Sequence, residues 1–167
     1  MKMLIWILII LATFSFMEFM AWFTHKYIMH GFLWSLHKDH HKKDHKSWFE
    51  RNDLFFLFYA IVSSSCVIIW GEYSFWAGLP IGIGIFIYGL TYFFVHDIFI
   101  HQRFKLLKNS NGRYAKAVRR AHKIHHKHLG KEGGECFGML WVPIKYFKNW
   151  LLFSPTVFKL TVVKIFV

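Results

Sequence analysis

The chain has 167 residues, of which 55% are apolar and 21% are aromatic, and its formal net charge is +12. This length fits one domain, but the apolar fraction is too high for an ordinary small soluble domain. The positive charge does not indicate nucleic acid, because the basic residues lie in loops that flank long apolar runs, as in membrane proteins. We therefore expect one membrane-embedded domain, residues 1–167, without a nucleic-acid partner.

Three apolar runs are long enough to be transmembrane helices, at about residues 3–23, 54–70 and 75–95. A short turn separates the second run from the third. The last segment, 137–167, is apolar but interrupted by lysines, so we expect an interfacial tail there. The predicted fold class is an all-α integral membrane protein with three spans, or four if the tail also crosses, and a cytoplasmic helical cap rich in histidine.

Ten of the twelve histidines form two copies of one pattern, H-x-x-x-x-H followed by H-x-x-H-H. The first copy lies in segment 24–53 and the second in segment 96–136. Neutral imidazole binds iron, copper, zinc and nickel. Because one metal ion takes three or four protein ligands, ten histidines exceed one site. We expect two metal ions with about five nitrogens each, from His25, His30, His37, His40, His41, His96, His101, His122, His125 and His126.

The two spacings make different demands on a helix. Residues at i, i+3 and i+4 share one face, so the three histidines of each H-x-x-H-H are expected to point at one centre. Residues five apart diverge by about 140° on an α-helix. The H-x-x-x-x-H pairs therefore require a helix that ends, bends or carries a π-bulge. Gly31 directly after His30 favours a helix end there.

Both histidine segments must lie on one side of the membrane if they share a site. The two apolar runs between them supply the even number of crossings that this requires. Segments 24–53 and 96–136 are basic, whereas the turn between the second and third runs carries only Glu72. Because cytoplasmic loops are rich in lysine and arginine, we expect both segments on the cytoplasmic face.

Ten neutral ligands would leave the positive charge of two metal ions uncompensated. Metal-bound histidines usually donate their second N–H to carboxylates or carbonyls. Glu18 lies within the first span, seven residues before His25 and almost on the same helical face. We expect Glu18 to accept such a hydrogen bond, with Asp97 and Asp39 as weaker candidates, and no catalytic side chain beyond the metal ligands.

Four segments carry a resemblance to a known family. They are EFMAWFTHKYIMHGFLWSLHKDHH at 18–41, FERNDLFF at 49–56, YGLTYFFVHDIFIHQRF at 88–104 and AHKIHH at 121–126. Together they resemble the bacterial β-carotene 3-hydroxylases of the fatty acid hydroxylase superfamily, over roughly residues 5–148. FERNDLF and FVHDIFIHQRF distinguish this branch from fatty acid and sterol hydroxylases, which share only the histidine motifs.

The resemblance implies two iron ions held by the ten histidines, with O₂ as co-substrate; zinc can substitute for iron in isolated protein. It implies hydroxylation at C3 of each β-ionone ring, from β-carotene to β-cryptoxanthin to zeaxanthin. Ferredoxin or a similar protein would supply electrons, and the carotenoid would enter from the lipid bilayer of the bacterial inner membrane, with the site on its cytoplasmic side. Trp22, Tyr92 and Phe94 lie within one turn of histidines and are candidates to line the ring pocket.

Two other functions stay open at this point. One is a fatty acid or sterol hydroxylase or desaturase of the same superfamily. The other is a non-enzymatic membrane carrier of haem or metal. A haem carrier would place histidine pairs within its spans, whereas these histidines cluster at span ends and in loops. Product analysis in a β-carotene-producing bacterium and a haem spectrum would separate the three.

Overall fold

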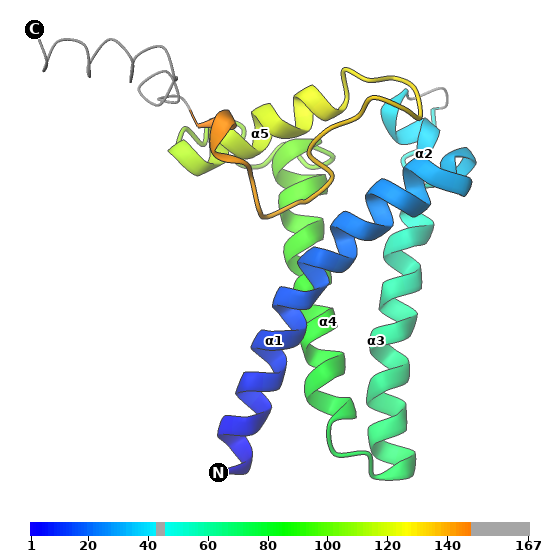
Figure 1. Cartoon of the computed structure of the whole chain (residues 1–167), viewed down its shortest axis with the longest axis vertical. Helices are drawn as coiled ribbons and strands as arrows, with labels where there is room; N and C mark the ends of the chain where they lie inside the picture. Colours follow the sequence, from blue (N-terminus) through cyan, green and yellow to red (C-terminus); the bar gives the residue numbers. More distant parts are fainter. Residues whose placement is uncertain (43–45, 148–167) are drawn as a thin grey trace, which may run out of the picture.

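The computed structural model describes residues 1–42 and 46–147. Every regular element among these residues is helical (Figure 1). Three helical stretches are long and apolar enough to cross a membrane, Lys2–Phe32, Asp53–Tyr73 and Gly78–Ile100. They contain the helices α1 (Lys2–Phe23), α3 (Asp53–Tyr73) and α4 (Gly78–Phe93). The chain is thus an all-α membrane protein with three spanning helices. Part of the expected tail, residues 148–167, lies outside the described residues, and so does any fourth span there.

Two of the spanning helices continue without a break into π-helical segments that carry histidines. Helix α1 runs into η1 (Thr24–Phe32) and α4 into η2 (Phe94–Ile100). The backbone N–H of His101 donates to the carbonyl of His96 at 2.8 Å, which is the i→i+5 bond of a π-helix. This bond stacks residues five apart, as the H-x-x-x-x-H spacing requires. Gly31 leaves the helical conformation within η1 (φ −99°, ψ −124°), at the expected helix end.

Helix α4 packs closely against both other spans because it carries small residues on two faces. A Cβ on Gly82 would lie 2.8 Å from Cγ2 of Val67 on α3, and one on Gly84 would lie 2.7 Å from Cβ of Thr13 on α1. The Ser63 hydroxyl on α3 also donates to the carbonyl of Gly82 at 2.8 Å. Such close approach and interhelical hydrogen bonding stabilise helix pairs in a bilayer.

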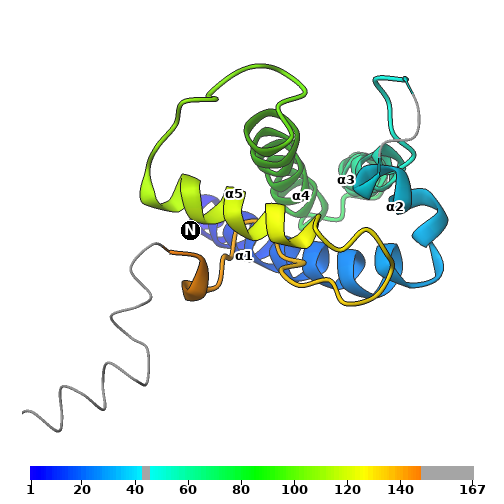
Figure 2. The same ribbon diagram turned by 90° about the horizontal axis from the view of Figure 1, so that it is seen from above.

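The cap consists of α2 (Trp34–His41), α5 (Arg113–His125) and the short 3₁₀ helix η3 (Ile144–Tyr146). It lies at the end of the bundle opposite the N-terminus and the α3–α4 connection (Figure 1). Seen from above, α5 lies across this end of the bundle (Figure 2). Both histidine segments are therefore at the same end of the molecule, as the pattern of spans predicts.

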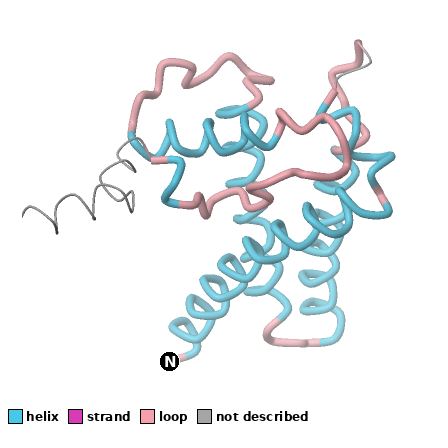
Figure 3. The backbone as a smooth tube through the Cα atoms, turned by 45° about the horizontal axis from the view of Figure 1, so that its top comes forward, coloured by secondary structure: helices cyan, strands magenta, loops and turns pink. Residues whose placement is uncertain are grey.

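The described beginning of the expected tail belongs to this cap. Tyr146 packs against Ala117 and Ala121 of α5, and the backbone of residues 139–141 contacts Glu18 on α1. The longer connecting segments gather around the same end, whereas the far end holds the α3–α4 connection (Figure 3). Residues 128–147 therefore cover the histidines rather than leave the domain.

Candidate metal centre

The ten patterned histidines form two adjacent groups. In each group, ligand atoms of several buried imidazoles lie within 4.8 Å of one another. We name them the first histidine group (His25, His30, His37, His41 and His125) and the second histidine group (His40, His96, His101, His122 and His126). His96 is assigned to the second group because its Nε2 lies 3.0 Å from that of His40.

Each group takes histidines from both halves of the chain. On α2, His37 and His41 belong to the first group and His40 to the second. At α5 the assignment is reversed: the middle histidine, His125, belongs to the first group, and His122 and His126 belong to the second. The expectation that each H-x-x-H-H serves one centre is therefore wrong. Positions i+3 and i+4 are about 100° apart around a helix, so two neighbouring centres divide the triplet between them.

The Nδ1 atoms of the first group all face oxygen acceptors. His25, His30, His41 and His125 lie 2.9 Å from the carbonyls of Phe137, Lys131, His128 and Glu135, and His37 lies 2.7 Å from Oδ1 of Asn52. A carbonyl oxygen can only accept, so each Nδ1 carries the proton. In a neutral imidazole, Nε2 then presents a lone pair.

These lone pairs point at one another. Within the first group the facing Nε2 atoms are 3.1–3.3 Å apart, and in the second group the Nε2 pairs His40–His96 and His101–His122 are 3.0 and 2.7 Å apart. Nε2 of His126 is buried without a hydrogen-bond partner among the described residues. Because facing lone pairs repel unless a cation lies between them, the donor sets fit two metal ions. The spacing leaves no room for a porphyrin between facing rings.

Burial keeps the cap histidines neutral. Burial is the largest cause of a lowered pKa at each of them, and the neighbouring histidines and, at His101, the Arg103 guanidinium lower it further. The pKa falls to about 2 for His37 and His126, about 3 for His125 and about 4 for His41 and His101, and lies well below its usual value for His40 and His122. Neutral imidazole is the form that binds a metal ion.

One of the three candidate carboxylates is hydrogen-bonded to a patterned histidine. Asp97 lies 3.2 Å from Nδ1 of His96. Asp39 instead accepts the backbone N–H of Arg51 at 2.8 Å, and its carboxylate lies 3.4 Å from the Arg51 guanidinium. These contacts position the segment that follows α2.

Glu18 makes a different set of contacts from the expected one. Its Oε1 accepts the backbone N–H groups of Met139, Leu140 and Trp141 at 2.8–2.9 Å, and its Oε2 accepts the hydroxyl of Tyr88 at 2.7 Å. These four donors satisfy a carboxylate within a span. None of them is a histidine, so Glu18 acts indirectly. It fixes residues 139–141, which lie close in sequence to the segment 128–137 whose carbonyls orient the first group.

Three residues that orient the histidines were not among the expected site residues. Glu50 accepts from Nδ1 of His40 at 2.8 Å, and Asn52 binds His37. Arg103 contacts three carboxylates, those of Glu50, Asp53 and Asp97, at 2.8–3.0 Å. All three residues lie in FERNDLF or FVHDIFIHQRF, so their polar character beside apolar spans was the available signal.

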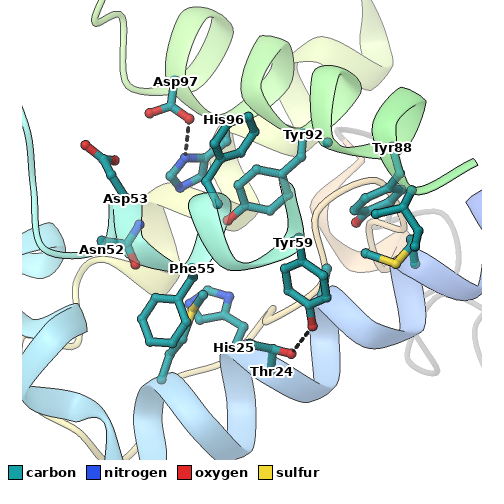
Figure 4. Close-up of a pocket in the computed structure, with 16 residues that line it drawn as sticks. Thr24, His25, Asn52, Asp53, Phe55, Tyr59, Tyr88, Tyr92, His96 and Asp97 are labelled. Carbon is teal, nitrogen blue, oxygen red and sulfur yellow. Dashed lines mark hydrogen bonds and ion pairs between the residues drawn. The ribbon is translucent and has the colours of Figure 1, made fainter. Parts of the chain in front are cut away.

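An apolar cavity between α1, α3 and α4 lies next to both groups, since it is lined by His25 of the first and His96 of the second (Figure 4). Tyr92 lines it, as expected, with its ring stacked on His96 at a centroid distance of 5.0 Å. Tyr59 also lines the cavity, and its hydroxyl is hydrogen-bonded to the Thr24 hydroxyl at 2.6 Å.

Two of the expected pocket residues lie elsewhere. Trp22 packs against Phe19 and Tyr27 and lines a separate surface groove. Phe94 is 47% exposed and does not line the cavity. These two residues were expected at the pocket because they lie close to histidines in the sequence. On a helix, closeness in sequence does not fix the direction in which a side chain points.

The chain is similar to known hydroxylases. The family model described as fatty acid hydroxylase matches residues 10–147. The beta-carotene hydroxylase of Pantoea ananas is 40% identical over 84% of this chain and 81% of its own length, and that of Pseudescherichia vulneris is 40% identical over 83% and 78%. Beta-carotene 3-hydroxylase 1, chloroplastic, of Arabidopsis thaliana is 35% identical over 76% of this chain and 41% of its own length.

No solved structure matches the chain significantly. The family match covers most of the residues that the structure describes, including all ten patterned histidines. The identity to two bacterial hydroxylases extends over most of their length as well. The chain therefore belongs to the fatty acid hydroxylase family and is an oxygenase of the branch that includes the bacterial beta-carotene hydroxylases.

Proposed function

We propose that the chain is a di-iron β-carotene 3-hydroxylase. One observation carries this proposal: two groups of buried imidazoles with facing lone pairs lie against an apolar cavity between membrane-spanning helices. Such a site combines metal ligands with access from a bilayer. The names of these three relatives support β-carotene as the substrate over a fatty acid or sterol.

The two histidine groups would each hold one iron ion, with five imidazoles as ligands of each. Bound iron would supply the activation of O₂: with two electrons and two protons, one oxygen atom enters the C3–H bond of a β-ionone ring and the other leaves as water. Two rounds convert β-carotene to β-cryptoxanthin and then to zeaxanthin. The protein's part is to keep the ligands neutral, fix their orientation and exclude bulk water from the cavity.

The cavity supports binding of a rigid apolar ring from the lipid side. Phe55, Phe56, Ile85 and Met17 supply apolar surface, and His25 and His96 end the cavity at the two histidine groups. A ring held among these side chains would meet the metal centre at the junction of both groups. The Thr24–Tyr59 pair is hydrogen-bonded within itself, so it adds little cost to burial of an apolar ligand.

The basic segments around the histidines support a cytoplasmic position for this end of the bundle in the bacterial inner membrane. There the cap would be accessible to a soluble electron donor such as reduced ferredoxin. The whole chain, residues 1–167, would act as one domain, because the histidine groups need residues from both α1 and α5.

Expression in a bacterium that accumulates β-carotene tests the function. The wild-type chain should convert β-carotene to β-cryptoxanthin and zeaxanthin, identified by chromatography and mass, and His37→Ala should abolish the conversion at equal membrane expression. Unchanged β-carotene together with newly hydroxylated fatty acids or sterols would replace the proposed substrate by one of theirs. A haem absorption spectrum in purified protein would contradict the di-iron site.

A further inference from the structure

The two histidine groups have the same number of ligands but different surroundings. In the first group, every Nδ1 faces a neutral oxygen, from four backbone carbonyls and the Asn52 amide. In the second group, the two Nδ1 atoms with oxygen partners face carboxylates, Glu50 at His40 and Asp97 at His96. The two groups therefore differ in charge although they match in ligand type.

The carboxylates of the second group belong to a buried ionic network. The Arg103 guanidinium contacts Glu50 at 3.0 Å, Asp53 at 2.8 Å and Asp97 at 2.9 Å, and the side chains of Arg103, Glu50 and Asp97 are each only 10–11% exposed. Three carboxylates and one guanidinium leave this network with a net charge of −2. One divalent ion held by neutral ligands beside it would neutralise that charge.

The network also fixes the geometry of the second group. Glu50 precedes α3, whereas Asp97 lies in η2, the continuation of α4, and Arg103 follows η2. Arg103 therefore joins the ends of two separate spans around the same two histidines. A carboxylate that accepts a hydrogen bond from a ligand imidazole raises the basicity of that ligand and its affinity for a metal ion. Neutral carbonyl partners orient a ring equally well but add no negative charge.

We propose that the two metal positions are unequal: the second histidine group binds its ion first and more tightly, and Glu50 and Asp97 are the positioning residues that cause the difference. This inference rests on the proposed dinuclear site. It follows that the first group holds the more weakly bound and more electron-poor ion. Partly loaded protein then contains a filled second group and an empty first group, rather than an even mixture.

Anaerobic titration of the metal-depleted full-length chain with ⁵⁷Fe(II), in detergent or lipid nanodiscs, tests the proposal. Iron retained per chain and Mössbauer spectra report binding without any need for turnover. The first equivalent should give one quadrupole doublet, and a second doublet should grow only with the second equivalent. We call the second histidine group the tight site and the first histidine group the weak site. His122→Ala should remove the tight site and His37→Ala the weak site. Two doublets growing together from the start would overturn the proposal.

Substitutions of the side chains that are hydrogen-bonded to the histidine Nδ1 atoms should change iron affinity in opposite directions. Glu50→Gln and Asp97→Asn should each weaken the tight site by about 10- to 100-fold and leave the weak site unchanged. Asn52→Asp places a carboxylate on His37 of the first group and should strengthen the weak site by about 10-fold. Glu72→Gln, the same charge change at the opposite end of the bundle, is the matched control for both sites.

The gain in Asn52→Asp keeps the proposal testable even if a loss variant fails to fold. An unchanged weak site in Asn52→Asp would overturn it, as would an equal loss at both sites in Glu50→Gln. Failure of the proposed function looks different: no iron would bind to either group, or iron would bind and β-carotene would stay unchanged in cells. Equal binding at two sites together with zeaxanthin formation would reject only the inequality.

Discussion

The first and second histidine groups contain histidines at the same spacings in the sequence, but different parts of the protein hold their rings in place. The backbone of residues 128–137 supplies four acceptors to the first group, and that segment is followed by residues fixed by Glu18. Charged side chains at the ends of α3 and α4 support the second group. A duplicated ligand pattern thus does not give duplicated sites. The first site should respond to changes in loop position and the second to changes in charge.

The largest effect is expected from replacing neighbouring histidines of α2 that belong to different histidine groups. His40→Ala should remove the ion of the second group and His37→Ala that of the first, although both residues lie on α2. Each loss should lower hydroxylation by more than the roughly 100-fold upper range known for outer-shell changes, because the chemistry needs both ions. Iron content per chain and zeaxanthin formation measure this. Loss of the same ion in both variants would contradict the exchange of ligands between the helices.

Removal of Arg103 should have the next largest effect, and it should act on the second group. Arg103→Met leaves Glu50, Asp53 and Asp97 as neighbouring carboxylates without a cation. Breaking a buried ionic network by removing one partner costs about 3–5 kcal/mol, here toward the low end because water reaches Asp53. The thermal midpoint of the purified protein measures the loss. Arg113→Met, exposed at the start of α5, is the control and should leave the midpoint unchanged.

Loss of the Glu18 carboxylate should act on the first group alone. Glu18→Gln removes the negative charge and one of the two acceptor oxygens, so the three backbone N–H groups of 139–141 and the Tyr88 hydroxyl no longer hydrogen-bond to a carboxylate, at a cost of about 1–3 kcal/mol. We expect roughly 10-fold weaker iron binding in the first group and none in the second. Tyr88→Phe removes only one of the four donors and should have a smaller effect. Equal weakening in both groups would show that Glu18 supports the whole cap.

The membrane spans, the histidine ligand candidates and a departure from regular α-helix at the H-x-x-x-x-H pairs could be predicted from the sequence because each depends on local patterns. Apolar length predicts spans, and a five-residue spacing on a helix requires i→i+5 stacking. The division of His37 and His40 between two groups could not be predicted, because it depends on where α5 lies relative to α2.

The residues that support the histidines from outside the two groups were harder to predict, because they too depend on how the helices pack. Glu18 was expected to accept a hydrogen bond from a ligand histidine, but its partners are the Tyr88 hydroxyl and backbone groups more than 120 residues away in sequence. Glu50 and Asn52 lie in a conspicuous polar motif, yet only the packing of α3 beside α2 brings them to His40 and His37. Tertiary contacts of this kind leave no periodic signal.

The smallest expected effect comes from the loop that supports the first group. Gly133 has a φ of +78°, a conformation that costs a residue with a Cβ about 1–2 kcal/mol. Gly133→Ala should therefore shift the carbonyls of Lys131 and Glu135 and weaken iron binding in the first group by roughly 5-fold, while the second group stays unchanged. Gly130→Ala is the matched control, because a Cβ at Gly130 meets no atom within 4 Å and needs no unusual φ. If the two alanine variants bind iron alike, the carbonyls of this loop do not set the affinity of the first group, and the contrast between loop support and charge support fails there.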